Sequence, residues 1–260
     1  DLGGIAPGKL ADILVFDDLM KLKPKKIFVG GMLVLSNGTI VSKIKKHPVP
    51  KWMTKTVKLN KFTEDNFSIK SHSDLVDVNV IDMKTEIITK KGHETLSVKD
   101  ENVIPSYDKD VWKVAAFDRT FGSTKHAVGF LKNFGPRIGA FASTWSFHEN
   151  NMIVIGSNEK DMAIAANSLL RTQGGMIVVY KGKILSSMPL QMAGIMSTDS
   201  FEKTSKNFSD INNMLLDSGC KFKKPHLIPL FLPFLALPEI RILHQGIIDV
   251  KSRSFLKTIV

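Results

Sequence analysis

The densest run of side chains able to perform acid–base or metal chemistry is TWSFHENN, residues 144–151. It lies between two apolar runs, GAFAST and MIVIGS, that predict strands. His148 and Glu149 are neighbours in this run, and an imidazole beside a carboxylate can act as an acid–base pair or supply metal ligands. A solvated turn between two strands is the alternative, and spacing alone favours it.

A second candidate follows the apolar run WKVAAF, where Asp118 and Arg119 end a predicted strand and a glycine-containing loop leads to His126. Loops at the carboxyl ends of strands often bind ligands in α/β sheets. The alternative is a surface ion pair with a flexible loop. We expect both loops to follow strands of one sheet, so that His148 and Glu149 converge with Asp118 or Arg119.

Motifs for a self-contained active site are missing from the sequence. There is no HxH, HExxH or CxxC, no GxSxG and no phosphate-binding P-loop. The seven histidines are widely spread. The single cysteine, Cys220, excludes an internal disulfide framework and a cysteine-based zinc site, and it fits a reducing cytoplasm. We therefore expect this chain to bind no metal or cofactor by itself.

The overall composition is that of a soluble globular protein, with 43% hydrophobic and 23% charged residues among 260. The net charge of +11 comes from lysines in short, scattered pairs without an aromatic-studded basic stripe, so we predict no nucleic-acid partner. The most apolar run, LIPLFLPFLALP at 227–238, is shorter than the roughly 20 residues of a membrane span and contains three prolines. We expect no membrane association and a cytoplasmic location.

The N-terminal 60 residues predict compact antiparallel β structure followed by a linker. Residues 10–16, LADILVF, suit a strand buried on both faces. Further strands are expected at 27–29, 32–35 and 39–41, the last two joined by an Asn37-Gly38 hairpin turn. Residues 42–60 carry two prolines and several lysines and are typical of a linker.

From residue 75 onward, strands and helices are intermixed, which predicts an α/β or α+β domain. Strands are expected in VDVNVID, TEIIT, ETLSV and WKVAAF, and a hairpin joins MIVVY to KILSSM across Lys181-Gly182. One helix is predicted to begin after Asn158 as N-cap and to end at Gly174. A second should run from about 201 to 217, with Phe201, Phe208, Ile211 and Leu215 on one face.

Two sets of motifs resemble known families. GGIAPGKLADILVFDDL, residues 3–19, resembles the segment that follows the catalytic barrel in amidohydrolases, where the chain returns to a small β-sandwich. RIGAFAST, MIVIGSNEKDMAIAANSLL, QGGMIVVYKGKILSSMPLQMAGIMS, LALPEIRILHQGIIDV and KDVWKVAAFDR are similar to the C-terminal domain of bacterial and archaeal adenine deaminases.

This resemblance implies two domains: residues 1–55 as C-terminal strands of the amidohydrolase β-sandwich with a linker, and 56–260 as an adenine deaminase-type α/β domain. The catalytic TIM-like barrel would then be absent from this chain. A first residue of Asp1 rather than Met suggests a chain that is partial, processed or renumbered.

The resemblance also implies an activity for the complete enzyme, the hydrolysis of adenine to hypoxanthine and ammonia. A divalent metal (Mn, Fe or Zn) in the barrel would lower the pKa of a bound water. Its ligands in the family are an HxH pair, further histidines, a Glu and an Asp, all upstream of the segment that starts here. We therefore expect this chain to be inactive alone, and adenine to be a substrate only of the complete enzyme.

The retained part departs from the family pattern at two loops. The family usually has Ala-His-Asp-x-His-Asn where this chain reads SFHENN, so that Phe147, His148 and Asn150 are replacements. Its Glu-Arg-His appears here as Asp118, Arg119 and Thr120. These changes indicate a diverged, adenine deaminase-related member.

Two hypotheses about the function remain open at this point. One is the C-terminal portion of an adenine deaminase-like amidohydrolase, whose partner is the missing barrel or another copy of the chain. The other is a non-catalytic assembly or partner-binding module derived from that family. Base rates predict a homo-oligomer in either case.

Overall fold

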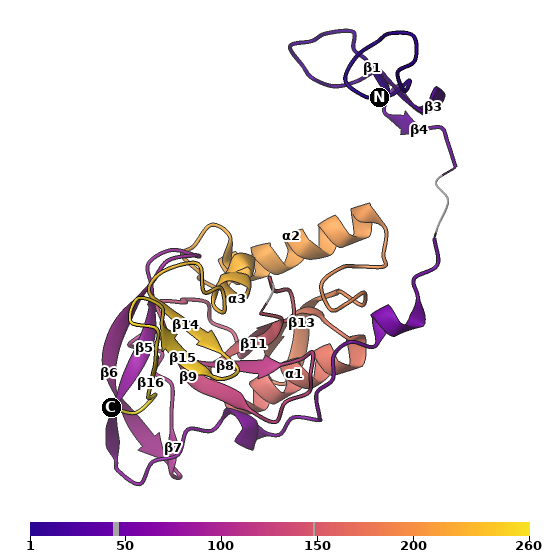
Figure 1. Ribbon diagram of the computed structural model, residues 1–260. Helices are drawn as coiled ribbons and strands as arrows, with labels where there is room; N and C mark the ends of the chain where they lie inside the picture. The colour runs from indigo at the N-terminus through magenta and orange to yellow at the C-terminus, as the bar shows by residue number, and fades with distance from the viewer. Residues whose placement is uncertain (44–46, 148) are drawn as a thin grey trace. The chain divides into compact units, whose positions relative to one another are not determined.

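The computed structural model describes residues 1–43, 47–147 and 149–260. The chain divides into two compact units, residues 1–48 and 49–260 (Figure 1). The change from one unit to the next falls inside the segment that the sequence marks as a linker. The assignment of 1–55 and 56–260 to two family domains stays a prediction.

Unit 1 is a four-stranded antiparallel sheet in the order β1-β2-β3-β4. Its strands are Ile13–Val15, Lys26–Val29, Met32–Ser36 and Thr39–Ile40. Asn37 and Gly38 link β3 to β4 with φ values of 48° and 79°. Positive φ at both central residues is what an Asn-Gly hairpin turn requires, so this prediction is confirmed.

The prediction of a doubly buried strand over residues 10–16 is wrong. β1 contains only Ile13–Val15, and Leu14 and Val15 are 56% and 38% exposed. The described residues of unit 1 supply one small sheet, with no helix and no second sheet to cover its faces. An apolar strand therefore stays exposed in this chain, because nothing within its own unit packs on it.

Unit 2 is built on a nine-stranded sheet in the order β13-β12-β10-β11-β8-β9-β5-β6-β7. Every neighbouring pair is antiparallel except β5 and β9, which are parallel. The strands are, in chain order, β5 Leu75–Met83, β6 Thr89–Lys99, β7 Asn102–Val103, β8 Val111–Asp118, β9 His126–Lys132, β10 Ala140–Ser143, β11 Asn151–Gly156, β12 Gly175–Tyr180 and β13 Lys183–Pro189.

Layers on both faces of this sheet explain its long apolar strands. Ala115, Met152 and Val154 point toward α1 (Glu159–Thr172). The residues that alternate with them along β8 and β11, such as Val114 and Ile153, point toward the opposite face of the sheet. The second face is covered by α2 (Phe201–Asp217), α3 (Ile228–Phe231) and a three-stranded sheet of β14 (Ile240–Leu243), β15 (Gly246–Asp249) and β16 (Ser254–Leu256) (Figure 1). All eight residues of β8 are buried, as expected for a strand covered on both faces.

The two predicted helices are confirmed. The Asn158 side chain accepts the Asp161 amide hydrogen at 2.8 Å to cap α1, and Gln173 (φ 57°) and Gly174 (φ 119°) end it in the left-handed region. In α2, Ile211 and Leu215 are buried as predicted. Phe201, predicted on the same stripe, is 82% exposed because the first turn of α2 extends beyond the sheet-packed part.

One predicted strand is wrong in unit 2. Residues 85–88 of TEIIT form a turn between β5 and β6, and only Thr89 belongs to a strand. The Thr85 hydroxyl accepts the amide hydrogens of Ile87 and Ile88 at 3.1 and 2.9 Å. A local side-chain hydrogen bond thus outweighs the β propensity of the two isoleucines.

The described part of unit 2 also contains three short 3-10 helices: η1 Lys51–Thr54, η2 Glu64–Phe67 and η3 Pro225–Leu227. Phe67 of η2 packs against the side of the sheet that carries α1. None of the helices in the described ranges is both long and apolar enough to span a membrane. The fold is a mixed α/β one, and the strand order among the described residues closes no barrel.

Candidate functional site

Strand register brings the two sequence-predicted loops to one edge of the nine-stranded sheet. Asp118, the last residue of β8, pairs with Asn151, the first residue of β11. Ser143 at the end of β10 pairs with Met176 near the start of β12, at the same edge. The loops that follow β8 and β10 therefore begin at the same edge, because both strands flank the antiparallel strand β11. The prediction that both loops follow strands of one sheet is confirmed, and the convergence of His148 and Glu149 with Asp118 or Arg119 stays a prediction.

Arg119 joins three loops at this edge. Its side chain donates from one terminal nitrogen to the Ala193 carbonyl at 3.0 Å and from the other to the Asn150 side-chain oxygen at 3.0 Å. Arg119 is 2% exposed, and burial lowers the pKa of its guanidinium to about 10 despite the nearby Asp118 carboxylate. Its Nε has no hydrogen-bond partner among the described residues. Arg119 is thus an internal clamp rather than half of a surface ion pair.

Asp118 is 6% exposed, and its carboxylate accepts hydrogen bonds from the loop that follows it. Oδ1 accepts the amide hydrogens of Thr120 and Phe121, both at 3.1 Å. This geometry caps the start of the 119–125 loop, in the manner of an Asx turn. One of the two carboxylate oxygens is therefore occupied by backbone donors.

Glu149 contacts the start of β11 through its backbone and the segment at Leu235 through its side chain. Its carbonyl oxygen accepts a hydrogen bond from the Asn151 side-chain Nδ2 at 2.8 Å, and its Oε1 lies 3.5 Å from the backbone nitrogen of Leu235. Its loop is the one that Arg119 holds through Asn150. His148, the other candidate in this loop, lies outside the described residues.

Asn151 links the edge to the three-stranded sheet. Its Oδ1 accepts the backbone amide hydrogen of His244 at 2.8 Å and lies 3.2 Å from His244 Nδ1. Asn151 is 1% exposed. Asn151 matches the final Asn of the family's Ala-His-Asp-x-His-Asn turn, but the sequence gave no sign that His244, 93 residues away, would be its partner.

Thr144 and Gly194 were missed by the sequence reasoning. The buried Thr144 hydroxyl donates to the Gly194 carbonyl at 2.7 Å and accepts the Gly175 amide hydrogen at 2.8 Å. Gly194 has φ +72°, and a Cβ there would lie 2.7 Å from an Arg119 terminal nitrogen. The only sequence signal was the glycine in QMAGIM, which indicates a turn without naming what it approaches.

His126, which follows the loop after Asp118 and Arg119, packs against the sheet. His126 begins β9, where its ring stacks on Phe117 with centroids 5.1 Å apart. Its Nδ1 lies 3.2 Å from the Thr124 carbonyl oxygen. The stacking indicates a packing role for this side chain.

The side chains at this edge do not form a metal-binding cluster within the described residues. No three His, Cys, Asp or Glu side chains in residues 1–43, 47–147 and 149–260 are grouped so that they could hold an ion. Asp118 is occupied by two backbone amides, and Arg119 places a cation beside it. These residues do not fit a divalent metal, and no catalytic step through one is derived for this chain.

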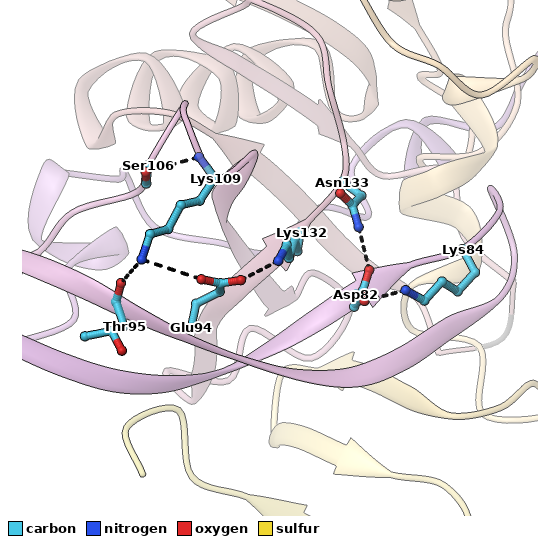
Figure 2. A network of polar contacts seen from close by, with 8 residues as sticks. All are labelled: Asp82, Lys84, Glu94, Thr95, Ser106, Lys109, Lys132 and Asn133. Atoms are coloured by element: carbon cyan, nitrogen blue, oxygen red, sulfur yellow. Dashed lines mark hydrogen bonds and ion pairs between the residues drawn. The ribbon is translucent and has the colours of Figure 1, made fainter.

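A separate polar network lies on β5, β6 and β9 and the residues next to them (Figure 2). Glu94 forms ion pairs with Lys132 and with Lys109, the latter at 3.6 Å, and the hydrogen bond to Glu94 raises the pKa of Lys132. Asp82 accepts from Asn133 at 2.7 Å and from Lys84 at 2.6 Å. Both carboxylates are already paired, which indicates that the network fastens the only parallel strand pair of the described sheet.

A buried ion pair lies on the α1 side of β8. Lys113 is fully buried and donates to Glu159 and, at 3.0 Å, to the Asn102 side-chain oxygen. Asn102 also donates to Glu159 at 2.7 Å. Burial lowers the pKa of Lys113, and the hydrogen bond from Lys113 holds the pKa of Glu159 below its ordinary value. The triad joins β8, β7 and the first turn of α1, and we assign it to folding.

Together the fold and this edge define a class: a mixed α/β domain whose candidate site is a buried, hydrogen-bonded edge of the sheet rather than a metal centre. Comparison with known proteins identifies the family. The family model described as the adenine deaminase C-terminal domain matches residues 86–254. The chain belongs to this family.

Alignment with complete proteins that contain this region identifies the same family. Over its full length the chain is 50% identical to an adenine deaminase of Cenarchaeum symbiosum, 34% identical to one of Clostridium botulinum and 31% identical to one of Desulforamulus reducens. The chain spans 42%, 44% and 44% of those three proteins, respectively. It is thus a portion of what its relatives contain.

Proposed function

We propose that this chain is the C-terminal portion of an adenine deaminase, whose complete polypeptide hydrolyses adenine to hypoxanthine and ammonia in the cytoplasm. The observation that carries the proposal is a 261-residue alignment at 50% identity to a protein named adenine deaminase, covering all of this chain. The divalent metal (Mn, Fe or Zn) of the complete enzyme would be held upstream.

In this proposal the polar edge of unit 2 positions loops. Arg119 holds the Ala193 and Asn150 segments, and Asn151 holds the β14–β15 turn through His244. Glu149 belongs to the loop that Arg119 holds through Asn150, and its role in this proposal is hydrogen bonding toward a purine or toward the rest of the enzyme. Asp118 acts indirectly, by capping its own loop.

Unit 1 supports the proposal of a missing partner. Its large apolar side chains are exposed without a covering layer: Leu2, Ile5, Leu10, Leu14, Val15, Leu19, Met20, Leu22, Val29, Met32, Leu33, Ile40 and Val41. Exposed apolar surface of this kind marks an interface. We propose that the upstream segment, or a second copy of the chain, covers it in the complete protein.

The same surface favours one alternative, a non-catalytic module that binds a partner through unit 1. The two candidates differ in what precedes Asp1. A coding sequence with an HxH-containing barrel upstream supports the deaminase, while a start codon near Asp1 supports the module.

Activity measurements on two proteins test the proposal directly. The complete polypeptide and residues 1–260 should be purified in parallel, supplied with Mn, Fe or Zn ions, and assayed for ammonia and hypoxanthine. We expect turnover only from the complete polypeptide, since metal catalysis needs a ligand set. Metal-dependent turnover by residues 1–260 would contradict the division of labour, and an inactive complete polypeptide would contradict the assigned reaction.

A further inference from the structure

A pocket of about 470 Å³ lies at the end of the nine-stranded sheet opposite the polar edge. It is formed where β8 begins, β12 ends and the chain leaves α2. Its lining includes Tyr107, Tyr180, Arg137, Lys221 and Asp108. None of these residues takes part in the site described above.

Two tyrosine rings form exposed walls of this pocket. Tyr107 is 56% exposed, yet its hydroxyl donates to the Ile138 carbonyl at 3.2 Å and its ring meets Trp112 edge-on at 5.3 Å. Tyr180 is 36% exposed, and its ring carries the Lys181 ammonium 5.1 Å from the centroid. The Lys181 ammonium thus lies over one face of the Tyr180 ring. An aromatic ring that is held in place and partly exposed can stack on a planar heterocycle.

The floor of the pocket is rigid. Asp110 accepts a hydrogen bond from Trp112 Nε1 at 2.8 Å and from the Gly135 amide at 2.9 Å. Gly135 has φ +92°, and a Cβ there would lie 3.0 Å from the Gly219 carbonyl oxygen. The loop that carries Arg137 is tied to the end of α2, because the Arg137 amide donates to the Ser218 carbonyl at 2.6 Å. The shape therefore exists before any ligand binds, which lowers the entropic cost of binding.

Two cations converge on the same pocket. Arg137 and Lys221 are both exposed, and within the described residues neither forms an ion pair. A guanidinium binds phosphate oxygens through two parallel hydrogen bonds, and an ammonium adds a point charge. The exposed Asp108 carboxylate can accept a hydrogen bond from an exocyclic amino group.

We propose that this pocket binds a purine nucleoside monophosphate. Tyr107 and Tyr180 stack on the base, Asp108 accepts from the amino group, and Arg137 with Lys221 binds the phosphate. The pocket volume lies in the range of small-molecule sites. The combination of aromatic walls with two cations favours a ligand that carries both a heterocycle and a phosphate, rather than either alone. This site lies outside the deaminase reaction proposed above.

Binding to the complete polypeptide tests the proposal by isothermal titration calorimetry with AMP, adenosine and inorganic phosphate. We expect saturable AMP binding, at least about tenfold tighter than adenosine or phosphate, because each of these lacks one half of the contacts. Arg137→Gln and Lys221→Gln should each weaken AMP binding by at least about tenfold. Lys223→Gln, which alters an exposed lysine outside the lining, should leave it unchanged.

Three outcomes would overturn the proposal. They are the absence of saturable AMP binding, equal AMP affinity in the Arg137→Gln and Lys223→Gln variants, and adenosine or phosphate binding as tightly as AMP. Because Arg137 and Lys221 are exposed, their variants should fold, and circular dichroism checks this. Tyr180→Ala is a further variant and should weaken AMP more than inorganic phosphate. Deaminase activity is a separate readout, so a failure here leaves the proposed reaction untouched.

Discussion

Buried cationic groups in unit 2 are satisfied mostly by neutral oxygens. Arg241 is fully buried and donates to the carbonyls of Leu237, Phe231, Ile87 and Pro238. Arg119 likewise binds a carbonyl and an amide oxygen. Burial lowers the pKa of both guanidinium groups to about 10. Such side chains are costly to bury and costly to leave unpaired, so their removal should be visible in stability.

Arg119→Gln should therefore destabilise the protein by about 2 to 4 kcal/mol, because the carbonyl of Ala193 and the Asn150 amide lose a buried donor. Arg119→Lys should recover only part of this loss, since an ammonium cannot span both acceptors as a guanidinium does. Urea unfolding measures the change. Arg253→Gln, at an exposed position, serves as the control and should change stability little. Equal stability of Arg119→Gln and the control would disprove the clamp.

His226 should make stability depend on pH. It is 6% exposed, and burial, with a smaller effect of Lys224, lowers its pKa from 6.5 to about 4, against an opposing effect of Glu86. The folded state therefore holds His226 neutral, with Nδ1 2.7 Å from the Asn212 amide oxygen. The unfolded state binds the proton at higher pH, so this contribution is complete above pH 6.5 and is lost as the pH falls toward 4.

The loss over this window should be on the order of 2 to 3 kcal/mol. It is measured as the change in the free energy of unfolding between pH 7 and pH 4.5. His226→Gln should flatten this dependence, whereas His93→Gln, at an exposed position on β6, should keep the wild-type slope. A slope that persists in His226→Gln would assign the pH dependence to other groups.

Helices in unit 2 are defined by their caps and by the faces they bury. α1 has a capped N-terminus, a left-handed C-terminal residue and a buried stripe against the sheet. α2 has a weaker N-terminal cap, with the Ser200 hydroxyl 3.3 Å from the Lys203 nitrogen, and buries only Ile211 and Leu215. Both helices pack on the sheet, but local capping should matter more to overall stability in α1, which buries more of its residues.

Asn158→Ala should destabilise the protein by about 1 kcal/mol, since the Asp161 amide loses its acceptor in a helix whose folding is coupled to the core. Asn158→Asp should retain most of the stability, because its carboxylate can accept the same hydrogen bond. Ser200→Ala is the matched cap removal in α2 and should cost less. Urea unfolding of the three variants measures the change in the free energy of unfolding. A larger loss of stability for Ser200→Ala than for Asn158→Ala would contradict this prediction.

At the scale of the whole molecule, the core belongs to unit 2. All buried hydrophobic residues among the described ranges lie at or beyond Val57. Unit 1 keeps its apolar side chains exposed, and its strands are only two to five residues long. A small sheet without a second layer has little burial to offset the entropy of ordering its chain.

Removal of residues 1–48 should therefore leave the thermal unfolding midpoint of unit 2 unchanged, because that unit loses none of its buried core. The protein should also become less prone to self-association, since the exposed apolar strands are gone. Calorimetry and light scattering on residues 49–260 and 1–260 measure both effects. A broad, non-cooperative transition in 49–260 would show that unit 2 depends on unit 1.

Local chemistry alone determined much of this protein from its sequence. Asn158, Gly174 and the Asn37-Gly38 turn predicted their elements because capping and positive φ are decided within a few residues. The apolar runs of β8, β11 and β12 predicted strands, and ordered blocks of residues indicated the family. The run that starts at Thr85 was predicted wrongly, because hydrogen bonds to the Thr85 hydroxyl turn a strand-like run of residues into a turn.

Tertiary structure decided which residues meet. The pairing of Asp118 with Asn151, the clamp from Arg119 to Ala193 and the contact from Asn151 to His244 join positions 33, 74 and 93 residues apart. Such contacts depend on strand register and on the packing of the small sheet, which no local pattern encodes. Burial is also a property of the whole fold, because the same apolar letters are exposed in β1 and buried in β8, depending only on whether another layer covers them.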